Sequence, residues 1–247
     1  MAKRNVLLAG VIMIILSYLP VFFLSNDTLR FLTIEDGFYE SVTAWLFLAA
    51  TIVFLYAFVR ARPRNVFFLL FVLAFFFAAG EEISWGQRIF HFATPASFEA
   101  NNAQEEFNIH NLNFIQHETG IGTSLLGMIL NFNRLFMLFC VLYTILIPLA
   151  NTYSAGLRSQ FSRLRIPIVS AWFGALFVFN EIVCKALELY VISCQSNCPD
   201  VYEIKEAVWS LLALLWGIYF LSAHAVASEA ATPAELSPAT GLPGGTG

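Results

Sequence analysis

Two adjacent carboxylates and an arginine are the side chains of this sequence best suited to chemistry. Glu81 and Glu82 follow a long apolar run, and Arg88 closes the stretch Gly80-Glu-Glu-Ile-Ser-Trp-Gly-Gln-Arg88. Ionisable groups at the end of a membrane helix are costly unless they are paired, hydrated or used, so they mark a candidate functional site. If the helix continues through this stretch, Glu81 and Arg88 share one face and can pair, whereas Glu82 points about 100° away.

A second cluster of reactive residues lies in the segment 104–111. Glu106 and His110 are four residues apart, a spacing that places both on one face of a helix. Near Glu81 and Glu82, they could supply general acid and base groups, or hold a divalent metal that activates a water molecule. In the first case Arg88 would bind a phosphate or a developing oxyanion. The candidate catalytic residues are Glu81, Glu82, Arg88, Asp36 and His110, and the candidate metal ligands are Glu81, Glu82, Glu106 and His110.

No established metal pattern supports the metal hypothesis. The sequence contains no HExxH, HxxxH or CxxC pattern and no GxSxG motif, so a metal site rests on the expected proximity of these residues alone. The alternative is that His110 is a hydrogen-bonding residue of a polar loop and binds no metal.

The elements that must position these residues are membrane helices. Of the 247 residues, 58% are hydrophobic and only 12% are charged, whereas a soluble domain has about 25% charged residues. The apolar runs are long enough to cross about 30 Å of hydrocarbon as helices. We therefore predict an all-α fold, a polytopic membrane helix bundle with about six transmembrane helices and both termini inside. The predicted spans are 6–24, 38–59, 65–86, 128–150, 166–191 and 201–223, in a single domain 1–224 with an outer-surface segment at 89–124 and a disordered tail at 225–247.

The charges divide between the two ends of these predicted spans. Most Lys and Arg residues fall at ends predicted to be inside, as the positive-inside rule expects. Nearly all Asp and Glu residues fall at the outer ends, where they should face a common polar chamber. Cations in the same region would neutralise some of them, and the excess implies protonated carboxyls, a hydrated cavity or a bound cation. The acidic residues are Glu35, Asp36, Glu40, Glu81, Glu82, Glu181, Glu188, Glu203 and Glu206, and the cations are Arg30, Arg88, Arg134, Lys185 and Lys205.

The loop between the last two predicted spans contains Cys194 and Cys198. A disulfide can persist in a loop on the outer side of a membrane, so we predict a structural bridge between them.

Three motifs of the sequence resemble those of a family of bacterial multi-pass inner-membrane proteins whose function is uncharacterised. They are Glu35-Asp36-Gly37 with Glu40 after it, the run Gly80 to Arg88, and Asn108-x-His110-Asn111 on a loop after Thr94-Pro95. The resemblance implies about six helices in a bacterial inner membrane and a polar site that faces the periplasm. It brings no reaction, substrate or cofactor.

Three classes of function are compatible with these features. The first is an enzyme that acts on a lipid or lipid-linked substrate, and the second is a proton- or cation-coupled transporter that uses Glu181 and Glu188. The third is an accessory subunit whose Phe-rich faces pack on partner helices. Membrane lipids are expected partners in each class and other membrane proteins in the third, and we expect no nucleic-acid partner.

Overall fold

The computed structural model describes residues 3–34, 37–113, 131–190 and 199–230. Within these ranges the chain is built of helices, and the only β-type pairing is an isolated antiparallel bridge between Asn102 and Leu112. The helices are α1 (Lys3–Phe23), α2 (Asn26–Thr33), α3 (Phe38–Arg60), α4 (Val66–Glu82), the 3-10 turn η1 (Ser84–Gly86), α5 (Gln87–Phe90), α6 (Ala96–Glu99), α8 (Phe132–Val141), the π-helical turn η2 (Leu142–Leu146), α9 (Ile147–Tyr153), α10 (Ala155–Leu164), α11 (Ala171–Tyr190) and α12 (Val201–Ala230).

The helices confirm the all-α prediction and suit a membrane. Four segments are long and apolar enough to cross one: Asn5–Phe23, Asn26–Arg60, Phe132–Tyr153 and Val201–Ser222. The remaining two predicted spans differ from these four, because α4 is only 17 residues long and α11 carries several charged side chains. The six-span topology therefore stays a prediction.

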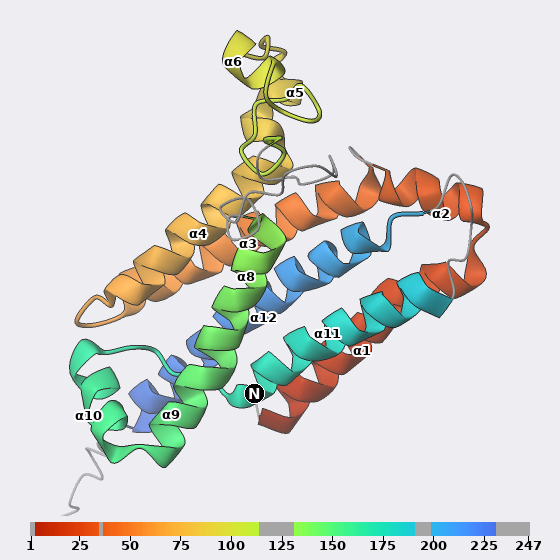
Figure 1. Ribbon diagram of the computed structural model, residues 1–247. Coiled ribbons are helices and arrows are strands. Elements are labelled where there is room, and N and C mark those ends of the chain that lie inside the picture. The colour runs from red at the N-terminus through yellow and green to blue at the C-terminus, as the bar shows by residue number, and fades with distance from the viewer. Residues whose placement is uncertain (1–2, 35–36, 114–130, 191–198, 231–247) are drawn as a thin grey trace, which may run out of the picture.

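A core of aromatic rings joins the long helices. Helix α3 packs along both α4 and α12, and α1 and α11 pack on α12 (Figure 1). At the centre, the fully buried Trp216 of α12 lies with its ring centroid 6.0 Å from Phe54 of α3, 5.0 Å from Phe71 of α4 and 4.9 Å from Tyr143 of η2. Aromatic pairs at these separations add to the stabilisation that burial provides. The cluster therefore ties α3, α4, α12 and the α8–α9 segment together.

The charged turns collect at the two ends of this bundle, as the sequence indicated. At the end that holds the N-terminus, the Nδ2 of Asn65 donates to the backbone carbonyl of Arg165 over 2.8 Å, which joins the two arginine-rich turns (Figure 1). At the opposite end, the backbone N–H of Asp200 donates to the hydroxyl of Thr33 over 3.0 Å. This contact joins the end of α2 to the start of α12. The acidic ends of α3, α4 and α12 thus lie away from the two arginine-rich turns (Figure 1).

Two segments predicted as loops contain helices. Helix α2 lies between the first two predicted spans and begins at Asn26, directly after Ser25, whose hydroxyl accepts the backbone N–H of Thr28. Helix α10 lies in the basic loop after the fourth predicted span and is capped in the same way by Ser154. Such side-chain caps satisfy backbone donors that a helix N-terminus leaves unpaired.

The last two helices also differ from their predicted bounds. Helix α11 begins at Ala171 rather than at 166, and residues 166–170 are not helical. Ile166 precedes a proline, a position that disfavours the helical conformation. Helix α12 continues to Ala230, so residues 225–230 are helical and do not belong to a disordered tail. The rest of the predicted tail, 231–247, lies outside the described residues.

Candidate functional site

Helix α4 ends at Glu82, and the chain then turns through left-handed backbone conformations. The φ angles of Ser84, Trp85 and Gly86 are 45°, 54° and 80°. This conformation costs about 1–2 kcal/mol for each residue other than glycine, so other contacts must hold the turn. The prediction that a helix continues to residue 86 and aligns Glu81 with Arg88 is therefore wrong, and the side chain of Arg88 lies outside the described residues.

The turn folds the indole of Trp85 back onto α4. A Cβ atom at Gly80 would lie 2.9 Å from the Trp85 ring, so only glycine allows this approach. The ring of Phe77 lies edge-on with its centroid 5.6 Å from that of Trp85. From this position the Nε1 of Trp85 donates to Oε1 of Glu81 over 2.6 Å.

The second carboxylate oxygen of Glu81 holds a distant segment of the chain. Its Oε2 accepts the backbone N–H groups of Ile109 over 2.7 Å and of His110 over 2.9 Å. The Nδ1 of His110 lies 3.4 Å from the same oxygen. Glu81 is only 3% exposed, and a buried carboxylate is stabilised when donors saturate it in this way. Glu81 thus joins the motif at 80–88 to the motif at 108–111.

Buried amides complete the structure that Glu81 anchors. The Nδ2 of Asn108 donates to the hydroxyl of Ser84 over 3.0 Å, and the hydroxyl of Ser84 donates to Oε2 of Glu106 over 2.5 Å. The side chain of Asn102 donates to Oδ1 of Asn108 over 2.8 Å. We call residues 84–113 the cap; it projects from the end of α4 (Figure 1). Its residues 104–111 form turns, so the predicted helical face shared by Glu106 and His110 does not occur.

Carboxyl groups from three helices converge beside the cap. The carboxyl of Glu82 on α4 interacts electrostatically with those of Glu40 on α3 and of Glu203 and Glu206 on α12. We call these four residues the carboxyl cluster. Glu206 also interacts electrostatically with His110 of the cap. These interactions agree with the expected convergence of acidic helix ends, and the shared polar chamber stays a prediction.

Other acidic residues of the predicted chamber have cations of their own. Lys205 is 4% exposed, with its Nζ 4.4 Å from the ring centroid of Trp209 and 4.5 Å from that of Tyr202. Glu181 interacts electrostatically with this lysine. Glu188 lies toward the surface, where its Oε2 is 2.7 Å from the Nζ of Lys185. Lys205 also interacts electrostatically with Glu206 and therefore links Glu181 to the carboxyl cluster, whereas Glu188 pairs with Lys185 at the surface.

The predicted metal ligands do not form a metal-binding arrangement in the described part of the chain. No three His, Cys, Asp or Glu side chains in it are placed to hold a metal ion. The carboxylates of Glu81 and Glu106 are occupied by N–H and O–H donors instead. Asp36 and the predicted bridge between Cys194 and Cys198 lie outside the described residues.

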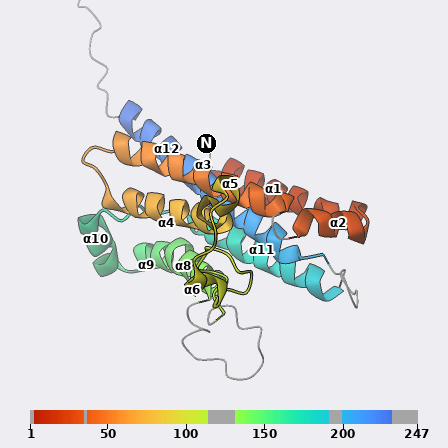
Figure 2. The same ribbon diagram turned by 90° about the horizontal axis from the view of Figure 1, so that it is seen from above.

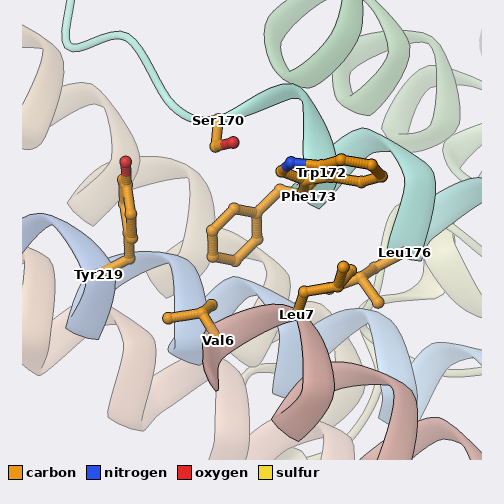
Figure 3. A pocket seen from close by; sticks show the side chains of 7 residues that line it. All are labelled: Val6, Leu7, Ser170, Trp172, Phe173, Leu176 and Tyr219. Atoms are coloured by element: carbon orange, nitrogen blue, oxygen red, sulfur yellow. The ribbon is translucent and has the colours of Figure 1, made fainter. Parts of the chain in front are cut away.

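A small pocket lies at the other end of the bundle, between α1, α11 and α12 (Figure 3). Its volume is about 10 Å³, at the lower limit for one water molecule. Its walls are mainly apolar, and the polar side-chain groups near it are the phenol of Tyr219, the hydroxyl of Ser170 and the indole N–H of Trp172 (Figure 3). It offers no acid or base and is not part of the candidate site.

Sequence reasoning missed residues that the structure makes central. The aromatic contacts of Lys205 follow from Tyr202 three residues before it and Trp209 four residues after it, a helical spacing that could have been noticed. The repeated asparagines between 101 and 113 are typical of turns in which side-chain amides bind the backbone. Nothing local indicates that Trp85 folds back onto Glu81, because that contact depends on the left-handed turn.

The described residues thus form a helical protein with membrane-compatible spans and a capped polar site at one end. No protein-family model, curated protein or solved structure matches the chain. The resemblance to a bacterial inner-membrane family therefore rests on the three sequence motifs.

Proposed function

We propose that the protein is a multi-pass membrane enzyme that performs acid–base chemistry on a lipid or lipid-linked substrate. The pairing of Glu81 with His110 carries this proposal. The side chain of Glu81 is 4% exposed, whereas the side chain of His110 is 29% exposed and can therefore be reached by a reactant. A carboxylate beside Nδ1 orients an imidazole ring and leaves Nε2 as the proton acceptor. In hydrolytic enzymes a carboxylate in this position hydrogen-bonds to Nδ1 of the general base. Here the 3.4 Å between Nδ1 and Oε2 makes no hydrogen bond, and the proposal requires this bond to form when a substrate binds.

The remaining residues have separate roles in this proposal. His110 accepts a proton from water or from a substrate hydroxyl, and Glu206, which interacts with it, exchanges that proton. Glu81 is a positioning residue, because its oxygens are taken up by Trp85 and by the cap. Arg88 keeps its predicted role as the residue that binds a phosphate group.

The surroundings of the site favour a lipid substrate. Ile89 and Phe90 of the cap are 63% and 75% exposed, and apolar side chains at the end of a membrane helix can contact acyl chains. The arginine-rich opposite end orients the site toward the periplasmic side of a bacterial inner membrane under the positive-inside rule.

A proton- or cation-coupled carrier is the second candidate, and the carboxyl cluster favours it. Glu40, Glu82, Glu203 and Glu206 bring carboxyls from three helices together, and such groups can take up and release cations in transport. In a carrier the substitution of Glu82 would abolish function, whereas the substitution of His110 would not.

Lipid conversion by the reconstituted protein tests the enzyme proposal. The wild type would be placed in nanodiscs made from a total bacterial lipid extract, and the lipids compared by mass spectrometry before and after incubation. We expect His110→Gln to lower the conversion rate by about 100-fold or more, the usual contribution of a general base. Glu188→Gln is the matched control at the surface of α11 and should keep the wild-type rate.

Two outcomes would overturn the enzyme proposal. One is a wild type that leaves every lipid unchanged. The other is proton uptake into proteoliposomes, followed with a pH-sensitive dye, that Glu82→Gln abolishes and His110→Gln leaves intact; this result would establish the carrier.

A further inference from the structure

The arginine-rich end of the bundle, opposite the candidate site, carries a second feature that the proposed function does not use. Helix α10 lies at this end, together with the turn between α3 and α4 (Figures 1 and 2). The segments 60–65 and 151–170 contain no Asp or Glu. Their cations are Arg60, Arg62, Arg64, Arg158, Arg163 and Arg165.

Helix α10 has an apolar stripe that the rest of the described chain covers only in part. Leu157, Phe161 and Leu164 are spaced by four and three residues and therefore share one face. Leu157 is 43% exposed and Leu164 is 61% exposed. Arg158 and Arg163 flank the stripe on its two sides. An amphipathic helix of this pattern binds in the plane of a membrane surface.

The position of α10 also fits a membrane surface. It follows directly after the segment Phe132–Tyr153, one of the four that could cross a membrane, with only Ser154 between them. Tyr153, at the end of that segment, is 84% exposed. Exposed tyrosines at span ends commonly lie at the level of the lipid headgroups. Helix α10 thus begins where a span would leave the hydrocarbon layer.

The arginines of this end divide into three groups by their contacts. The guanidinium groups of Arg60 and Arg64 lie 5.5 Å and 5.7 Å from the ring centroids of Tyr56 and Phe58. Arg62 donates to the carbonyl of Val59 at the end of α3, and Arg158 donates to carbonyls at the end of α9, so both satisfy helix C-termini. The side chains of Arg163 and Arg165 are exposed and form no hydrogen bond or ion pair with any residue that the structure describes. The backbone carbonyl of Arg165 is fixed by Asn65. These two guanidinium groups are therefore available to a ligand outside the protein.

We propose that this end is a binding site for the headgroups of anionic phospholipids. The guanidinium groups of Arg163 and Arg165 bind the headgroup phosphates, a match of planar donors to phosphate oxygens. Leu157 and Leu164 enter the acyl layer beneath the headgroups. This proposal requires only that the protein is embedded in a membrane. It does not depend on a catalytic role of His110.

Native mass spectrometry of the detergent-purified full chain tests this proposal, with phosphatidylglycerol as the anionic probe and phosphatidylcholine as the neutral one. We expect tighter binding of phosphatidylglycerol by the wild type. The double variant Arg163→Gln/Arg165→Gln should weaken that binding on the order of 30-fold, which corresponds to about fivefold for each arginine near an anionic surface. Arg30→Gln, a control on exposed α2 at the opposite end, should bind phosphatidylglycerol like the wild type.

A second variant tests the apolar part of the site. Leu157→Ser/Leu164→Ser should bind both lipids more weakly and keep the preference for phosphatidylglycerol. Equal affinity of the wild type for the two lipids, or unchanged affinity in either double variant, would overturn the proposal. A folded circular-dichroism spectrum for each variant separates these results from misfolding, and neither variant touches the residues of the lipid-conversion assay.

Discussion

The same chemical change at two neighbouring residues should have different effects on the cap. Glu81→Gln replaces a carboxylate that accepts from Trp85 on one oxygen and from Ile109 and His110 on the other. Glutamine has only one side-chain oxygen. If that oxygen still accepts the N–H groups of Ile109 and His110, the NH2 group faces the indole N–H of Trp85, and two donors cannot form a hydrogen bond. Loss of one hydrogen bond to a charged acceptor costs about 1.5–3 kcal/mol. Glu82→Gln instead changes a carboxyl that interacts electrostatically with the other members of the carboxyl cluster and accepts no hydrogen bond from the described residues of the cap.

Hydrogen exchange followed by mass spectrometry measures this difference directly, because it reports the free energy of local opening. In Glu81→Gln, peptides that cover residues 105–113 should exchange about 10- to 150-fold faster than in the wild type, the factor that corresponds to this energy. In Glu82→Gln they should exchange no faster than in the wild type. Unchanged exchange in the first variant, or faster exchange in the second, would show that Glu81 does not anchor the cap.

Two further substitutions test the packing of the site by thermal unfolding in detergent. Gly80→Ala should lower stability by about 1–3 kcal/mol, because its Cβ would lie 2.9 Å from the ring of Trp85; Gly156→Ala on α10, where nothing lies within 4 Å, should gain up to about 1 kcal/mol. An equal effect at both glycines would contradict the close packing of Trp85. Lys205→Met should lower the free energy of unfolding. Breaking a buried ion pair costs about 3–5 kcal/mol, and we expect a value near the lower end of this range because Glu181 is only half-buried. An unchanged unfolding temperature would show that this lysine does not neutralise Glu181.

Much of the helical framework could be predicted from the sequence. The apolar runs gave α3 within one residue of its observed end, and the start of α12 at residue 201. The physical reason is that a membrane-compatible helix needs a long uninterrupted apolar run, which composition alone reveals. The arginine-rich turns and the acidic helix ends lie at opposite ends of the bundle, as the charge pattern indicated, whereas the six-span topology stays a prediction (Figure 1).

The site itself was predicted only in part, because its contacts depend on backbone geometry rather than on spacing. The sequence indicated both Glu81 and His110, and the structure places them in contact. It also indicated a straight helix through Trp85, and that prediction failed. A left-handed turn at non-glycine residues is unfavourable locally and forms only when distant contacts hold it. Those contacts come from Asn108 and Glu106, more than twenty residues away in the chain.

The double role of Glu81 decides which substitution can test catalysis. Glu81 closes the cap through backbone donors and also orients His110, so Glu81→Gln would lower activity even if it took no part in the reaction. His110→Gln removes the imidazole but keeps the backbone N–H that Glu81 binds. The cap should therefore stay closed in this variant, with wild-type hydrogen exchange at 105–113. A loss of lipid conversion with unchanged hydrogen exchange would assign the proton transfer to His110. A loss of lipid conversion that comes with faster hydrogen exchange would instead be explained by opening of the cap.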